Sequence, residues 1–300
     1  QPLINTGNIT CLYTDPDGYC WVGTNTQGLF SFRPQPPVFE LIRQPAPEQN
    51  FIRSLYYDSL YHRLWAGSFE NGILVYDSSG QLIKQLTPTE LSGGQFSKKG
   101  YNAFVPYNNE LLLAWGEYTD PVLISRSSLS NKGTISWQIP DSLRERFSQF
   151  GQRHYFDRVV MTNENTGWFQ FNKSIARFRI SKNQLQLEHL IPVPDFYNDA
   201  LTTDEQHDLW WGNHSTIYHY ATGSERLERF ATTGSALVKS LLPRKDQVWA
   251  GTDNGIFIFN KNGKLEKRLN LSDGLPNNYI YSLLQDQAGN KWGSTNNGLF

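Results

Sequence analysis

The sequence predicts an all-β fold, a seven-bladed β-propeller of four-stranded antiparallel blades with an incomplete last blade. The first observation is a repeated phrase, Trp-x-Gly-Thr or Trp-x-Gly-Ser followed by Gly-Leu or Gly-Ile, with clear copies at Trp21, Trp65 and Trp249. A fourth copy closes the chain, and weaker copies centre on Trp115, Trp168 and Trp210. The second observation is spacing: successive tryptophans lie 39 to 53 residues apart when their numbers are subtracted. A period of about 40–50 residues is typical of propeller blades.

The composition agrees with β-structure and excludes some functions. Aromatic residues make up 14% of the chain, and such residues suit the half-buried surface of a strand. The formal net charge is −1, so there is no electrostatic basis for nucleic-acid binding by this domain. We find no run near the roughly 18 apolar residues that a membrane span needs.

The first repeat predicts the order of elements in a blade. Residues 9–13 alternate in polarity as an inner strand does, and Asp15-Pro16-Asp17-Gly18 favours a turn. Residues 20–24 and 28–32 are the next two strands, and residues 39–42 are a plausible outer strand. We expect the repeated tryptophans to pack between neighbouring blades. The glycines would allow backbones to approach closely or to turn; the repeat residues assigned these roles are Trp21, Gly23, Trp65, Gly67, Trp115, Trp168, Trp210, Trp249, Gly251 and Trp292.

The same order, applied along the chain, places one domain over residues 1–300. Its blades are expected at residues 5–48, 49–98, 99–150, 151–195, 196–233, 234–274 and 275–300. First strands of the later blades are expected at residues 52–57, 102–107, 156–161, 200–203, 237–242 and 280–285. The segment 140–150 is the best candidate for a helical turn, and we interpret it as an insertion at the surface.

The first and the last repeat each have one further feature, a pair of cysteines in the first and a missing outer strand in the last. Cys11 and Cys20 lie in the first hairpin, where pairing of Tyr13 with Cys20 would make the thiols diagonal neighbours. That separation exceeds the distance that a disulfide prefers, so buried thiols are favoured and a disulfide is the alternative.

The last blade stops at Phe300 without an outer strand, which would leave an open sheet edge. We therefore expect the native polypeptide to continue beyond residue 300.

The last repeat resembles a known family. The run from Asp273-Gly274-Leu275-Pro276 through Ser282-Leu283-Leu284-Gln285-Asp286, with Gly289-Asn290-Lys291-Trp292 and Asn297-Gly298-Leu299-Phe300, is similar to a two-component regulator propeller repeat. The likeness extends over essentially the whole chain, most clearly in blades one, two, six and seven. It departs from the family phrase at Ser294, where glycine is usual, and in the degenerate blades three to five.

The resemblance implies a function. Such repeats form the periplasmic sensor region of hybrid two-component systems in glycan-degrading bacteria. This chain would then help to detect an oligosaccharide and would need no cofactor. Other parts of the same polypeptide would be a second propeller, a β-sandwich, a membrane helix and a histidine kinase. A homodimer of the chain is a further possible partner arrangement.

Candidate ligand-binding residues follow from the blade order. The connections after each Trp-x-Gly-Thr phrase and those that lead into each first strand should share one face of the disc. Aromatic side chains ringed by hydrogen-bonding groups on that face would suit a carbohydrate. Blades three to five diverge most from the repeat and supply the candidates, which are Glu117, Tyr118, Arg153, His154, Tyr155, Tyr197, Asn198, Trp211 and His214. The alternative is that these are ordinary rim side chains.

Metal and catalytic chemistry have weaker signals. The six histidines show no metal-ligand spacing; they are His62, His154, His189, His207, His214 and His219. Asp15-x-Asp17-Gly18 lacks the later acidic ligands of a calcium loop. No nucleophile or cofactor motif occurs, although His154, Glu117 and His214 could form an acid–base site. We therefore expect no metal and no enzyme, with a propeller lyase, a glycan hydrolase and a protein-interaction scaffold as alternatives.

Overall fold

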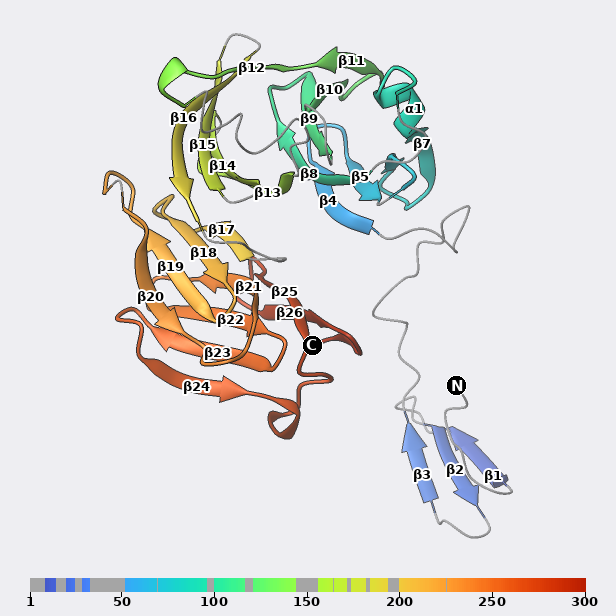
Figure 1. Cartoon of the computed structure of the whole chain (residues 1–300). Helices are drawn as coiled ribbons and strands as arrows, with labels where there is room; N and C mark the ends of the chain where they lie inside the picture. Colours follow the sequence, from blue (N-terminus) through green and yellow to red (C-terminus); the bar gives the residue numbers. More distant parts are fainter. Residues whose placement is uncertain are drawn as a thin grey trace. The chain divides into compact units, whose positions relative to one another are not determined.

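A computed structural model describes most of the chain and divides it into two compact units, Gln1–Pro45 and Ala46–Phe300. The described residues are 9–14, 20–24, 29–32, 52–68, 70–95, 100–116, 121–143, 156–163, 165–171, 174–181, 184–193, 200–224 and 226–300. They form strands almost throughout, as the composition predicted (Figure 1).

The first unit contains one antiparallel sheet with the order β1-β2-β3. Its strands are β1 (Ile9–Thr14), β2 (Cys20–Thr24) and β3 (Leu29–Phe32), so the three strands predicted here are confirmed. The register differs from the prediction by one residue, because Cys20 pairs with Thr14 and Cys11 pairs with Gly23. The expected pairing of Tyr13 with Cys20 is therefore wrong: the connection is one residue shorter than we assumed. The outer strand predicted at residues 39–42 lies outside the described residues.

The second unit contains six sheets, one for each later repeat (Figure 1). The first two are β4 (Ile52–Asp58), β5 (Arg63–Ser68), β6 (Ile73–Tyr76) and β7 (Leu82–Leu86), then β8 (Tyr101–Pro106), β9 (Leu111–Gly116), β10 (Val122–Ser125) and β11 (Asn131–Thr134). The third joins β13 (Phe156–Met161), β14 (Thr166–Phe171), β15 (Ser174–Ser181) and β16 (Gln184–Pro192) to β12 (Ser136–Gln138).

The remaining three sheets have regular meander order. They are β17 (Ala200–Thr203), β18 (Leu209–Asn213), β19 (Thr216–Tyr220) and β20 (Glu228–Thr232); β21 (Val238–Pro243), β22 (Gln247–Thr252), β23 (Gly255–Asn260) and β24 (Leu265–Leu269); and β25 (Ile280–Gln285), β26 (Lys291–Thr295) and β27 (Gly298–Leu299). The last sheet has three strands, the number expected for the incomplete blade.

The prediction of seven blades is wrong, because the propeller in the second unit has six. The sheet of the first repeat belongs to the other compact unit. The physical reason is that the repeated phrase specifies a sheet and its turns. It does not specify which neighbour that sheet packs against, so a count of phrases overstates the blades in one body.

Neighbouring sheets of the propeller contact one another in chain order, through their first strands. β4 lies against β8, β8 against β13, β13 against β17, β17 against β21, and β21 against β25. This arrangement gathers the first strands of the sheets around a common space, which the next subsection describes.

Five of the repeated tryptophans pack between sheets of the propeller, as predicted: Trp65, Trp115, Trp168, Trp210 and Trp249. Trp65 is fully buried with residues of its own sheet and with Tyr101 and Leu112 of the next. Trp115 lies in the same way against Phe169 and Phe178, with ring centroids 5.9 and 5.3 Å away. Trp168, Trp210 and Trp249 occupy the matching clusters further along the chain. Burial of large aromatic side chains at each junction is thus a main source of stability.

The glycine of the phrase meets the first strand of the next sheet. A Cβ on Gly67 would lie 2.2 Å from the Tyr101 carbonyl oxygen, and one on Gly251 would lie 2.7 Å from Ile280 Cγ2. The close approach of backbones predicted for these glycines is confirmed at Gly67, whereas at Gly251 the atoms that approach belong to the Ile280 side chain. In the last sheet Ser294 takes this ladder position, opposite Ser282.

The threonine of the phrase closes the following turn. Thr252 Oγ1 donates to the Gly255 carbonyl at 2.7 Å and accepts from the Asn254 N–H at 3.0 Å. Thr295 makes the same pair of bonds to Gly298 and Asn297. The glycine after the turn has a positive φ, +94° at Gly255, which a side chain disfavours.

Thr252→Val tests this account of the turn. Thr252 is fully buried, so loss of its hydroxyl leaves the Asn254 N–H and the Gly255 carbonyl without their partner. We expect the free energy of unfolding to fall by about 1–3 kcal/mol, measured by urea denaturation. Thr216→Val is the matched control, because the Thr216 hydroxyl makes no hydrogen bond with another described residue. An equal effect of the two substitutions would contradict the role given to Thr252.

Three local features complete the fold. The helix α1 (Pro88–Leu91), capped by Thr87, was not predicted. β12 pairs in parallel with β16 and brings Trp137 to within 5.8 Å of the Trp115 ring centroid. Of the helical turn predicted at residues 140–150, residues 141–143 are helical and residues 144–150 lie outside the described part.

Candidate functional site

Most of the ligand-binding residues that the sequence predicts lie outside the described residues. They are Glu117, Tyr118, Arg153, His154, Tyr155, Tyr197 and Asn198. The structure places the other two, Trp211 and His214, and so describes only a small part of that cluster.

The structure puts Trp211 in the core of the propeller. Its side chain is 1% exposed, on β18, and packs with Tyr218 at a centroid distance of 5.0 Å. An indole buried to this degree offers no ring face to a sugar. The sequence placed Trp211 at a rim connection, but β18 continues to Asn213, so Trp211 lies inside the strand and its side chain points into the core.

His214 is exposed at the turn between β18 and β19. It has a positive φ of +49°, its Nδ1 lies 2.5 Å from Asn213 Oδ1, and its carbonyl accepts from the Val238 N–H at 2.6 Å. That last bond joins the turn after one phrase to the start of the next first strand. In the following sheet, Asp253 Oδ1 accepts from the Leu237 N–H at 2.7 Å, which joins the same two kinds of connection. These connections therefore lie together on one face, as expected.

A cavity of about 700 Å³ lies among the first strands of the propeller. Its walls come from β4, β13, β17, β21 and β25, with Ser294 of β26. The volume is within the range of small-molecule sites, about 300–1,000 Å³. No sequence pattern pointed to this cavity, because it forms only where strands far apart in the chain meet.

β-Bulges decide which side chains face this cavity. The ladder between first and second strands skips one residue in β4, β21 and β25, and the skipped residues are Arg53, Lys239 and Tyr281. All three line the cavity. The serines that follow two of the bulges bond sideways to the next sheet: Ser54 Oγ donates to the Tyr101 carbonyl at 2.9 Å, and Ser240 Oγ accepts from the Leu283 N–H at 2.8 Å.

The charge of this cavity is one-sided. Arg53, Arg158 and Lys239 line it, and no carboxylate is among its described lining residues. Arg158 and Lys239 make no hydrogen bond or ion pair with another described residue, whereas Arg53 does interact within the protein. Because the whole chain has a net charge of −1, this cationic lining is a local property.

A second cavity, of about 490 Å³, has a balanced lining. Glu205, Asp246 and Glu266 face the cations Arg244, Lys245 and Lys291. Its aromatic residue, Trp249, is covered by Lys291, whose Nζ lies 5.0 Å from the ring centroid. Because the opposite charges in this cavity can pair with one another, the cavity is less suited than the first one to bind a charged ligand.

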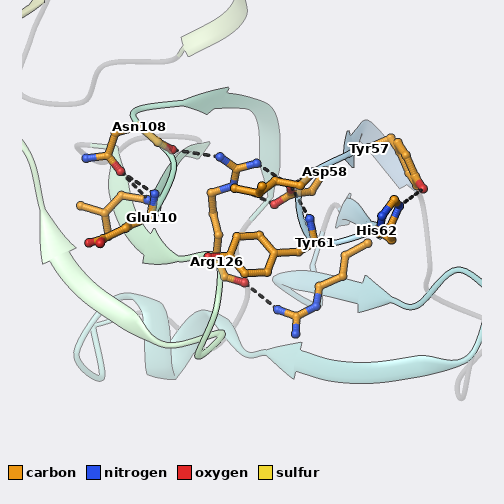
Figure 2. Close-up of polar contacts among 10 residues, drawn as sticks. Tyr57, Asp58, Tyr61, His62, Asn108, Glu110 and Arg126 are labelled. Atoms are coloured by element: carbon orange, nitrogen blue, oxygen red, sulfur yellow. Dashed lines mark hydrogen bonds and ion pairs between the residues drawn. The ribbon is translucent and has the colours of Figure 1, made fainter.

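A buried ion pair joins the first two sheets of the propeller, as Figure 2 shows. The Asp58 carboxylate is fully buried and accepts from Arg126 Nε at 2.8 Å and from a terminal guanidinium nitrogen of Arg126. Arg126 also donates to the Asn108 carbonyl at 2.9 Å, and its guanidinium lies 5.6 Å from the centroid of the Tyr61 ring. Burial by itself would raise the pKa of Asp58, but the bonds from Arg126 and the Tyr61 N–H outweigh it and hold that pKa below its usual value. The pair is a junction between sheets, since neither group has a side open to a ligand.

One group of side chains has the composition of a metal site. The carboxylates of Asp204 and Asp208 and the His219 ring lie within 4.8 Å of one another. Their atoms are already engaged: Asp204 Oδ2 accepts from Trp210 Nε1 at 2.8 Å, and Asp208 Oδ2 lies 3.0 Å from His219 Nε2. Asp286 accepts from Trp292 Nε1 in the same manner, at 2.9 Å. The group is therefore the turn element of the repeat, in which a carboxylate binds the tryptophan.

The comparisons with known proteins agree with the resemblance inferred from sequence. A family model described as two component regulator propeller matches residues 2–26, which is the first repeat. Among solved structures, the chain is similar to the extracellular domain of a putative hybrid two component system from B. thetaiotaomicron, with 18% identity and a TM-score of 0.65. A second such domain from the same organism has 13% identity and a TM-score of 0.60. Among curated proteins, no sequence matches the chain.

The chain spans only part of these neighbours. The alignments cover 97% and 96% of this chain but 37% and 39% of the two extracellular domains. The chain is also similar to a virginiamycin B lyase from Staphylococcus aureus, with 13% identity, a TM-score of 0.59 and coverage of 96% of this chain and 92% of the lyase. At these identities the likenesses establish the shared propeller fold. In the described part of the chain, no helix is long and apolar enough to cross a membrane.

Proposed function

We propose that this chain is an extracytoplasmic sensor propeller of a hybrid two-component signalling protein and that it helps to detect an oligosaccharide. The observation that carries the proposal is the match of the first repeat to the two-component regulator propeller model. The fold supports it, because two structural neighbours are extracellular domains of such systems and this chain aligns to them over nearly all of its length. The cavity among the first strands supplies a place for a small ligand.

The rest of the signalling protein would lie outside this chain. Because the chain spans less than two fifths of either neighbouring domain, further extracytoplasmic modules are part of the proposal. A second propeller, a β-sandwich, a membrane helix and a kinase would carry the signal inward, and a homodimer would allow the two copies to act together. Binding of the ligand would shift the balance between two arrangements of these modules by its differential affinity for them.

A propeller lyase is the second candidate, and the likeness to virginiamycin B lyase favours it. Of the three acid–base residues that the sequence suggested, only His214 lies in the described part of the chain. The Nδ1 atom of His214 faces the amide oxygen of Asn213, which does not titrate. A general acid–base pair would need a second titrating side chain within reach of the substrate, and the described residues beside His214 do not supply it.

Incubation of the protein with a panel of oligosaccharides separates the two candidates. We expect binding by calorimetry and no new product by mass spectrometry after prolonged incubation. The panel should include pectic, glycosaminoglycan and neutral glucan fragments, which differ in charge. Formation of any cleavage product would replace the sensor with an enzyme, and loss of that product in the His214→Ala variant would assign a catalytic role to His214.

A further inference from the structure

The first-strand cavity presents cationic side chains, and this says what kind of ligand it accepts. In β4 and β21 the bulges turn Arg53 and Lys239 toward the cavity, and β13 contributes Arg158. A concave site lined by charges of one sign concentrates ions of the opposite sign. Two of the three cations, Arg158 and Lys239, make no bond to another described residue, so a ligand would not have to displace an internal partner from them.

The same cavity has hydrophobic and hydroxyl groups beside its charges. Tyr281 is 52% exposed, and its hydroxyl donates to Asn296 Oδ1 at 2.7 Å, which fixes the direction of the ring. Leu55 is 65% exposed on β4. A sugar ring can stack on the Tyr281 ring and contact Leu55 while its charged substituents meet the cations. Ser282 and Ser294 add hydroxyls, which suit the other hydroxyls of a sugar.

We propose that this cavity binds an acidic oligosaccharide, whose carboxylate or sulfate groups are held by Lys239 and Arg158. The proposal rests on the proposed function and narrows it to a class of ligand. Arg53 adds to the positive potential of the site. Carboxylate and sulfate share the same recognition chemistry, a fixed anionic group that accepts charge-assisted hydrogen bonds from ammonium and guanidinium groups.

The test is a calorimetric titration of the full chain with four probes: trigalacturonate, a sulfated chondroitin disaccharide, neutral maltotriose and inorganic sulfate. We expect at least one of the two acidic sugars to bind, the neutral sugar to bind at least about tenfold more weakly, and added salt to weaken only acidic binding. The comparison between carboxylated and sulfated probes identifies which anionic group is recognised.

Variants connect the binding to this cavity. Lys239→Gln and Arg158→Gln should each weaken acidic binding by about tenfold, because each removes one charge-assisted bond. Lys264→Gln removes the same charge at an exposed turn outside the cavity and should change nothing. Thermal unfolding midpoints verify that the variants fold, which is expected since none of the three side chains is buried.

Each negative outcome has a distinct meaning. Binding of maltotriose without binding of either acidic sugar would overturn the proposal that the ligand is acidic, while oligosaccharide detection would stand. Binding of acidic sugars that is insensitive to Lys239→Gln and Arg158→Gln would overturn the assignment to this cavity. Binding of inorganic sulfate alone would reduce the site to a simple anion site. If no sugar binds, the proposed function fails for this chain together with the inference.

Discussion

Replacement of Gly67 by alanine is expected to lower the free energy of unfolding by about 3 kcal/mol, the upper part of the range for overpacking. A Cβ at this position would lie 2.2 Å from the Tyr101 carbonyl oxygen and 2.4 Å from Ser54 Oγ. The Tyr101 backbone belongs to the next sheet and cannot yield without moving β8 away from β4. The substitution therefore acts on the junction between two sheets. Urea denaturation followed by tryptophan fluorescence measures it.

Gly234→Ala is the control for this experiment. Gly234 has a φ of +78°, so alanine there is strained, but nothing lies within 4 Å of the added Cβ. Backbone strain alone costs about 1–2 kcal/mol. A smaller loss for Gly234→Ala than for Gly67→Ala would confirm that close approach of sheets, more than glycine flexibility, explains the glycine of the phrase. Equal losses would contradict that explanation.

Arg126→Met is expected to destabilise the propeller by about 3–5 kcal/mol, because it leaves the Asp58 carboxylate buried without its cation. The double substitution Asp58→Asn with Arg126→Met should recover at least about half of this loss. An asparagine oxygen can still accept from the N–H groups of Leu60 and Tyr61. Arg179→Met, which removes an exposed ion pair with Glu188, is the control and should cost about 0–1 kcal/mol. Equal effects of Arg126→Met and Arg179→Met would contradict the account.

The Asp58–Arg126 pair also predicts a dependence of stability on pH. The pKa of Asp58 is lowered in the folded protein from its ordinary value of 3.8. Its contribution is therefore fully present above that value and is lost as the pH falls through the lower, folded-state pKa. The stability difference between the wild-type protein and the double variant should narrow as the pH falls below 3.8. A constant difference from pH 6 to pH 3 would show that ionised Asp58 contributes nothing.

Much of the fold could be predicted because the repeat encodes local structure. Each part of the phrase has a defined structural role: the tryptophan fills a junction between sheets, the glycine allows the next strand to approach, and the threonine closes a turn, as at Trp65, Gly67 and Thr252. The number of blades in the propeller could not be derived in this way. The tryptophan and the glycine require a neighbouring sheet, but they do not specify which sheets of the chain belong to the same propeller. The parallel pairing of β12 with β16 escaped prediction for the same reason.

The site was less predictable than the fold. Loop position pointed to rim residues, of which the structure describes only Trp211, in the core, and His214, at a turn. The cationic cavity depends on bulges at Arg53 and Lys239 and on strands more than a hundred residues apart in the chain. A bulge leaves no clear signal in an alternating pattern, although a charged residue inside an otherwise regular first strand, such as Lys239, is the trace it left here.

The most direct test of a ligand-sensing propeller is calorimetric titration of trigalacturonate and of the chondroitin disaccharide into the wild-type chain and into Lys239→Gln. The account predicts saturable, salt-sensitive binding of at least one of them, with a dissociation constant about tenfold higher in the variant. The absence of binding to the wild-type protein, or equal binding to both proteins, would contradict it.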